Sequence, residues 1–195
     1  MIFLSAPKGD EDWRFTMPRI TPIQDPQPET PVGTTFAQIK GKLGKVPNAF
    51  ATIAHSAAAL DGYLAFASAL SNGRLTPRQR ELIALLVSQA NECQYCLSAH
   101  TLTARKAGLS REQVLEARAG RSEDPLNDAI LAFTREAVAQ RGQVSDAEFE
   151  AAHSAGLDDG LLMEIVANIA LMTVTNYSNR LADPAIDFPV VQTQL

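Results

Sequence analysis

The chain has 195 residues, 46% of them hydrophobic, and its formal net charge at pH 7 is −5. This length and composition suit one domain with a buried core and exclude disorder of the whole chain. An acidic chain without a basic stripe excludes a nucleic-acid-binding surface, and its longest apolar runs, such as residues 165–172, are far shorter than the ~20 residues of a membrane helix. We therefore expect neither a nucleic acid nor a membrane as a partner.

The first 33 residues are expected to be an N-terminal extension and a proline-rich arm outside the domain. The apolar residues after Met1 have no basic segment before them, so they make a poor secretory signal and the expected compartment is the cytoplasm. Met17 is an alternative start, which would leave residues 1–16 as an extension. Five prolines between residues 18 and 33 exclude a helix there and predict an extended arm.

Helix signals dominate from residue 34 to residue 190. Thr76 before Pro77, with Gln79 three residues after the threonine, is a capping box that predicts a helix over 77–90. No segment alternates convincingly between apolar and polar residues, so the predicted fold class is an all-α domain over 34–190 with a short tail at 191–195. Further helices are predicted over residues 34–43, 48–55, 56–70, 111–118, 126–140, 146–154 and 159–181.

One more helix is predicted to start at Glu92 behind an Asn91 cap and to end at Gly108, which forms a helical hairpin with 77–90. The only two cysteines of the chain, Cys93 and Cys96, lie in its first turn, and His100 follows one turn later. At about 100° per residue these three side chains would share a stripe roughly 60° wide. Two thiols and an imidazole are therefore expected on one face of this helix.

Glu81 joins this group through the geometry of the hairpin. It lies ten residues before Asn91 and His100 lies nine after it, so antiparallel helices rising ~1.5 Å per residue would place the two side chains level. The carboxylate would then orient the imidazole and favour its charged form, and a nearby imidazolium would lower a thiol pKa. The array of Glu81, Cys93, Cys96 and His100 predicts a reactive cysteine.

At these residues the sequence resembles the alkyl hydroperoxidase D (AhpD)-like, carboxymuconolactone decarboxylase superfamily, in particular its peroxidase-related branch. The resemblance covers roughly residues 17–190. Supporting segments are residues 44–48 (GKVPN), 55–56 (HS), 176–179 (NYSN) and 187–189 (DFP). The resemblance implies an AhpD-like helical bundle, a homo-oligomer, and no haem, flavin or metal cofactor.

The resemblance also implies an activity and a role for each site residue. Cys96 would attack hydrogen peroxide or an organic hydroperoxide, Cys93 would resolve the product to a disulfide, and His100 and Glu81 would relay protons. An external dithiol or protein reductant would then regenerate the pair. Family members carry a histidine directly before the second cysteine, where this chain has Tyr95. Around an ideal helix Tyr95 falls about 100° from Cys96, so we expect it to lie off the reactive stripe.

Several other interpretations of these residues stay open. The cysteines are alternatively buried small side chains, or zinc ligands together with the histidine and the glutamate. Alternative functions are a redox sensor or binding module without turnover, and a cofactor-free decarboxylase-like enzyme. His55 and His153 are interpreted as capping or surface groups. Asn176 and Asn179, on an otherwise apolar helix, are expected to make structural hydrogen bonds at a subunit contact.

Overall fold

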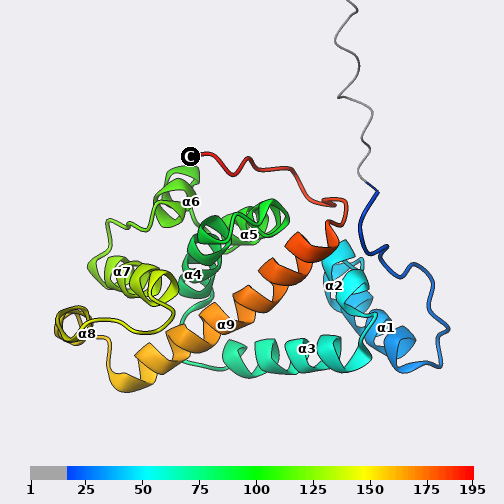
Figure 1. The fold of residues 1–195 in the computed structure, drawn as a ribbon, viewed down its shortest axis with the longest axis horizontal. Coiled ribbons are helices and arrows are strands. Elements are labelled where there is room, and N and C mark those ends of the chain that lie inside the picture. Colours follow the sequence, from blue (N-terminus) through cyan, green and yellow to red (C-terminus); the bar gives the residue numbers. More distant parts are fainter. Residues whose placement is uncertain (1–16) are drawn as a thin grey trace, which may run out of the picture.

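A computed structural model describes residues 17–195, and the expected extension over residues 1–16 lies outside this part of the chain. The described residues form nine α-helices and no strand, which confirms the all-α prediction (Figure 1). The helices are α1 (Pro31–Leu43), α2 (Asn48–Ile53), α3 (Ala57–Ser71), α4 (Pro77–Ala90), α5 (Gln94–Lys106), α6 (Arg111–Arg118), α7 (Pro125–Ala139), α8 (Asp146–Ser154) and α9 (Asp159–Ala182).

Helix α4 occupies the middle of the molecule and packs against α5, α6, α7 and α9 (Figure 1). Ile83 and Val87 on one side of α4 join the core shared with α7 and α9, and Leu82 and Leu86 join the core under α5 and α6. A helix with apolar residues on two sides is typical of the centre of a bundle. Burial on both sides fixes the rotation of α4 and therefore the direction of Glu81.

Most helix ends follow local capping signals. The predicted capping box at α4 is present, because Thr76 Oγ1 accepts from Gln79 N at 3.2 Å and Gln79 Oε1 accepts from Thr76 N at 2.9 Å. The proline-rich arm ends earlier than predicted, since α1 begins at Pro31 behind a Thr30 cap. Proline is well tolerated at a first helical position, where its missing N–H needs no partner.

The start of α5 differs from the prediction in a way that affects the site. Asn91 caps the C-terminus of α4, Glu92 has a left-handed backbone with φ of 51°, and Cys93 is the N-cap of α5. Arg180 holds this turn by donating to the carbonyl oxygens of Asn91 at 2.6 Å and Glu92 at 3.1 Å. The cysteine pair therefore spans the helix start, and Cys93 is not on the helical stripe.

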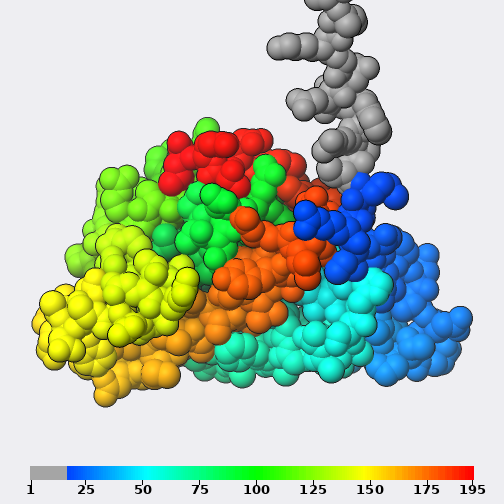
Figure 2. Space-filling model, in the orientation of Figure 1, coloured from blue at the N-terminus to red at the C-terminus, as the bar shows by residue number. Residues whose placement is uncertain are grey.

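Both ends of the described chain run over the helices as extended segments. Ile20 N donates to Ala182 O at 3.2 Å and Ile23 N donates to Ala51 O at 3.0 Å, which holds the proline-rich arm. Residues 183–195, which we call the C-terminal strap, cross the ends of α5 and α6 (Figures 1 and 2). The nearly buried guanidinium of Arg118 donates to Gln192 O at 2.8 Å, and Ser98 Oγ accepts from Val191 N at 3.0 Å.

Helix α9 is the one helix of the described part that is long and apolar enough to cross a membrane, although the short apolar runs of the sequence led us to expect none. Its 24 residues nevertheless carry Asn168, Asn176 and Asn179 on the buried side, and it contacts α2, α3, α4, α5 and α7. The core helix of a soluble protein passes the same test of length and composition. One side of α9 is packed in the core, and the opposite side is exposed.

Thr76→Ala tests whether local capping sets the start of α4. Loss of the side-chain acceptor for Gln79 N should lower the free energy of unfolding by about 1 kcal/mol, which for a domain of this size corresponds to a fall of about 2–4 °C in Tm. Ser68→Ala, at an exposed position inside α3, is the matched control and should change Tm little. Equal effects of the two substitutions in thermal unfolding followed by circular dichroism would contradict this assignment.

Candidate active site

The two cysteines meet across the first turn of α5. Both are free thiols, Cys93 is 1% exposed and Cys96 is 2% exposed. Cys93 has the extended backbone of an N-cap, and its Sγ accepts a hydrogen bond from Cys96 N at 3.3 Å. An N-cap side chain folds back over the first turn of its helix, so the two sulfur atoms lie in the same turn. This placement suits a disulfide that needs little backbone movement.

The pair is electrostatically unequal. The pKa of Cys96 is lowered to about 7, chiefly by the hydrogen bond from the Cys93 thiol, against the opposing effect of burial, and further by Asn179 and by the His100 charge. The pKa of Cys93 is raised, because its proton is held in that hydrogen bond and because the thiol is buried. Asn179 Nδ2 donates directly to Cys96 Sγ at 3.2 Å. Cys96 is therefore the sulfur that carries the negative charge.

Glu81 and His100 face each other across the α4–α5 hairpin, as their spacing from the turn predicted. His100 Nδ1 lies 2.9 Å from Glu81 Oε2, and Thr103 Oγ1 donates to the same carboxylate oxygen at 2.7 Å. Burial lowers the pKa of His100, but the charge and hydrogen bond of Glu81, aided by Cys96, outweigh burial and raise it. The carboxylate thus orients the imidazole and favours its protonated form.

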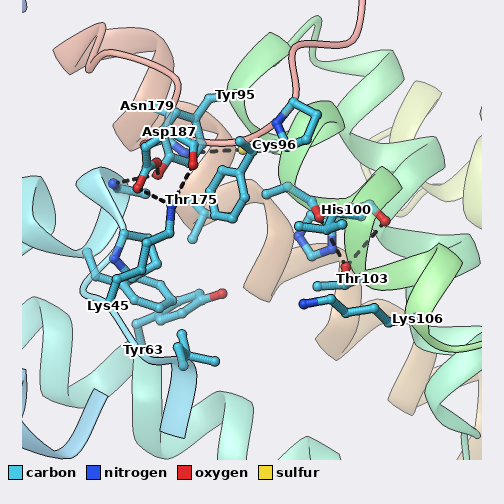
Figure 3. Close-up of a pocket in the computed structure, with 18 residues that line it drawn as sticks. Lys45, Tyr63, Tyr95, Cys96, His100, Thr103, Lys106, Thr175, Asn179 and Asp187 are labelled. Atoms are coloured by element: carbon cyan, nitrogen blue, oxygen red, sulfur yellow. Dashed lines mark hydrogen bonds and ion pairs between the residues drawn. The ribbon is translucent and has the colours of Figure 1, made fainter. Parts of the chain in front are cut away.

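Cys96 and His100 open into a cavity of about 330 Å³ (Figure 3). Its walls come from α1, α2, α3, α5, α9 and the C-terminal strap, and they are largely apolar and aromatic. Among the lining side chains are Phe50, Tyr63, Tyr95, Leu102, Thr175 and Phe188. A small apolar cavity with a few convergent polar groups is typical of a site for a small molecule.

Tyr95 contributes to the cavity wall, a role that its predicted position off the reactive stripe did not indicate. Its hydroxyl donates to Asp187 Oδ1 at 2.6 Å and accepts from Ala49 N at 3.0 Å. Lys45 forms an ion pair of 2.8 Å with Asp187 Oδ2 and lies 4.4 Å from the centre of the Phe188 ring. Tyr95 lies in the first turn of α5, and its hydroxyl reaches the strap at Asp187. It fastens the strap over the cavity.

Two of the three asparagines of α9, Asn176 and Asn179, have different hydrogen-bond partners, although both lower the pKa of Cys96. Asn176 makes structural bonds, donating to Ser88 Oγ at 3.2 Å and accepting from Asn91 Nδ2 at 2.9 Å. Asn179 was expected to be structural as well, yet it donates to Cys96 Sγ. A buried amide needs a partner, but the sequence alone does not show that this partner is a thiol 83 residues away.

The remaining candidates lie away from the cysteine pair. His55 Nε2 is 2.9 Å from Thr21 O and holds the arm, and His153 lies 3.1 Å from Asp159 near the start of α9. Within residues 17–195, no group of three or more histidine, cysteine, aspartate or glutamate side chains is placed to hold a metal ion. The zinc alternative for the four-residue array therefore has no support in this geometry.

Comparisons with known proteins cover the same region. The model of the carboxymuconolactone decarboxylase family matches residues 54–139, which include all four residues of the array. A 48-residue stretch is 44% identical to alkyl hydroperoxide reductase AhpD of Mycobacteroides abscessus, and a 58-residue stretch is 34% identical to uncharacterized protein 4 in the cox locus of Paracoccus denitrificans. These stretches are 25% and 29% of this chain, and they span 27% and 52% of the two relatives.

Solved structures share the fold over most of the chain. A peroxidase-related protein with an alkylhydroperoxidase AhpD core from Ralstonia eutropha JMP134 is 27% identical, with a TM-score of 0.74 over 86% of this chain and 93% of that one. A peroxidase-related protein from Silicibacter sp. TM1040 has a TM-score of 0.75 at 22% identity, over 92% and 100% of the chains. The debrominase Bmp8, in complex with 2,3,4-tribromopyrrole, has a TM-score of 0.70 at 23% identity, over 86% and 91%.

The unequal thiols predict selective alkylation. Because the pKa of Cys96 is lowered to about 7, its reaction with limiting iodoacetamide should rise as the pH passes through about 7 and then level off, whereas Cys93 should stay largely unlabelled. Asn179→Leu removes a donor to the thiolate and should move this rise to higher pH. Asn168→Leu, at an amide of α9 that donates to Glu164 O, is the control. Preferential labelling of Cys93 by mass spectrometry would reverse the assignment.

Proposed function

Since the chain belongs to the AhpD-like, carboxymuconolactone decarboxylase superfamily, we propose that it is a thiol-dependent peroxidase that reduces hydrogen peroxide or organic hydroperoxides. The observation that carries the proposal is the Cys96 sulfur, which has a lowered pKa, faces an apolar cavity and has a second thiol in the same helical turn. Thiols in such surroundings are reactive, whereas cysteines that only fill space are not.

The first half of the proposed cycle oxidises Cys96. A hydroperoxide enters the cavity and the Cys96 thiolate attacks its terminal oxygen, which breaks the O–O bond and leaves a sulfenic acid on the sulfur. The departing alkoxide or hydroxide takes a proton from His100, whose Nδ1 is held by Glu81. The imidazolium thus serves as a general acid. The apolar walls of the cavity favour binding of an organic hydroperoxide over binding of water.

The second half forms and then reduces a disulfide. Cys93 attacks the sulfenic sulfur, and the hydroxyl group leaves with the Cys93 proton as water. Cys93 already points at the first turn of α5, so the Cys93–Cys96 bond forms with a local adjustment. An external dithiol or protein reductant then returns both cysteines to thiols. Thiols supply all the electrons, and we place the protein in the reducing cytoplasm, where such pairs are recycled.

Hydroperoxide turnover with excess dithiothreitol tests this function. Wild type should consume cumene hydroperoxide, Cys96→Ser should lose turnover, and Glu81→Gln should lower the rate by ~10²-fold, the usual contribution of an acid–base partner. Gln79→Glu is the control for a change of one charge on α4, because the side chain of Gln79 is hydrogen-bonded to Thr76 and Asn127 and not to His100. A wild-type protein that oxidises once without turnover would indicate a redox sensor instead.

The outer face of α9 is a candidate interface for the homo-oligomer that the resemblance implies. Exposed or half-buried apolar side chains recur there at spacings of four and three, at Met163, Ala167, Ala170, Val174, Tyr177 and Leu181. This is the repeat with which one helix packs against another. In an antiparallel pair of α9 helices, the small Ala167 and Ala170 would face the larger Tyr177 and Val174 of the second copy. We propose a two-fold dimer through this face.

Ala170→Glu should abolish that dimer, because it would bury two carboxylates of equal charge near the two-fold axis. Light scattering after gel filtration should give twice the chain mass for wild type and the chain mass for the variant. Ala37→Glu, on an exposed face of α1, should leave the mass unchanged. A monomeric wild type, or a variant that keeps the wild-type mass, would contradict this interface.

A further inference from the structure

The two thiols line different cavities. Cys96 lines the aromatic cavity described above, and Cys93 does not. Cys93 lines a second cavity, also of about 330 Å³, and Cys96 does not. Tyr95 and Asn179 contribute to both walls, so they form the partition between the two spaces. The cysteine pair therefore lies between two openings.

The second cavity differs from the first in its chemistry. Two guanidinium groups, Arg19 and Arg180, and two carboxylates, Glu92 and Asp183, line it. Within residues 17–195, the side chains of Arg19 and Asp183 make no hydrogen bond or ion pair, whereas Arg180 is committed to the turn before Cys93. An arginine and an aspartate are thus free to bind opposite charges on one molecule. In the aromatic cavity the one carboxylate near a cation, Asp187, is already paired with Lys45 at 2.8 Å.

From this division we infer that the reductant enters through the polar cavity and attacks the sulfur of Cys93, while the hydroperoxide enters through the aromatic cavity. The inference rests on the proposed function, because it describes how the disulfide of that cycle is reduced. The reductant that suits this cavity is a thiol of the amino-acid or peptide class. Its carboxylate would pair with Arg19 and its ammonium group with Asp183.

The reduction is a pair of thiol–disulfide exchanges. The reductant thiolate attacks Cys93 Sγ, a bond forms between these two sulfurs, and the Cys93–Cys96 bond breaks with its electron pair on Cys96. A second reductant thiolate attacks the reductant sulfur of this mixed disulfide, which releases Cys93 as a thiolate that takes up a proton. Two thiols become one disulfide, and the protein gains two electrons. Cys96 is the natural leaving group, because the thiol of lower pKa leaves faster.

Trapping of the mixed disulfide tests the direction of attack without any substitution. The Cys93–Cys96 disulfide is prepared with diamide, so the experiment does not depend on peroxidase activity. One equivalent of reduced glutathione is added and the mixture is quenched with iodoacetamide. Peptide mass spectrometry should find glutathione on Cys93 and the alkyl group on Cys96. Glutathione on Cys96 would overturn the inference even if the protein is a peroxidase.

A pair of plugging variants tests the two entrances. Gln94→Trp narrows the polar cavity and Leu102→Trp narrows the aromatic one. Stopped-flow measurements should show slower disulfide reduction by glutathione in Gln94→Trp, and slower oxidation by cumene hydroperoxide in Leu102→Trp. Each variant should keep the other half-reaction within about twofold of wild type. If Leu102→Trp slows reduction as much as Gln94→Trp does, both reactants use one entrance and the inference is wrong.

Rates of disulfide reduction test whether Arg19 and Asp183 recognise the charges of the reductant. Arg19→Gln and Asp183→Asn should each lower the rate of reduction by glutathione by about fivefold, the effect of one exposed ion pair, and leave reduction by uncharged dithiothreitol unchanged. Asparagine tolerates the left-handed backbone that Asp183 adopts, with φ of 50°, so this variant keeps the helix end. Equal losses with both reductants would show that these side chains do not recognise charge.

Discussion

The contact between Glu81 and His100 across the α4–α5 hairpin is the interaction on which the rest of the site depends. It brings a carboxylate and an imidazole to 2.9 Å in a partly buried place, with each side chain about one fifth exposed. The charge of Glu81 raises the pKa of the imidazole, and the imidazolium in turn helps to lower the pKa of Cys96. The contact requires α4 in one rotation, which its two-sided burial provides. Core packing and acid–base chemistry are therefore linked through one helix.

The sequence was a good guide wherever a local signal decided the structure. The predicted ranges of α4 and α6 match the structure residue for residue, and the spacing of Glu81 and His100 predicts their hydrogen bond. The predicted start of α5 was wrong, because residues 91–94 resemble a capping box although Cys93 is the actual N-cap. What decides between the two arrangements is distant, namely the bonds from Arg180 to the carbonyl oxygens of Asn91 and Glu92. A single sequence does not reveal such long-range contacts.

The parts of the site that the sequence missed are all brought in from far along the chain. Asn179 reaches Cys96 from α9, and Asp187 reaches Tyr95 from the strap. Tyr95 stands where the resemblance leads us to expect a histidine. It does not only remove a proton donor, because its hydroxyl links Asp187 of the strap to Ala49 N. In this chain the residue before the second cysteine has a structural role, and the proposed mechanism assigns the proton chemistry to His100. The four-residue array was predictable, but the walls of the cavity were not.

The position of Cys93 as a helix cap explains why two identical side chains differ. One thiol donates a hydrogen bond and the other becomes the thiolate. The central claim is that this pair cycles between thiols and a disulfide, and a count of free thiols tests it most directly. After one equivalent of hydrogen peroxide under native conditions, both thiols should be lost with helix content unchanged, and a dithiol should restore both. Thiols that never react with peroxide in the folded protein would contradict the account.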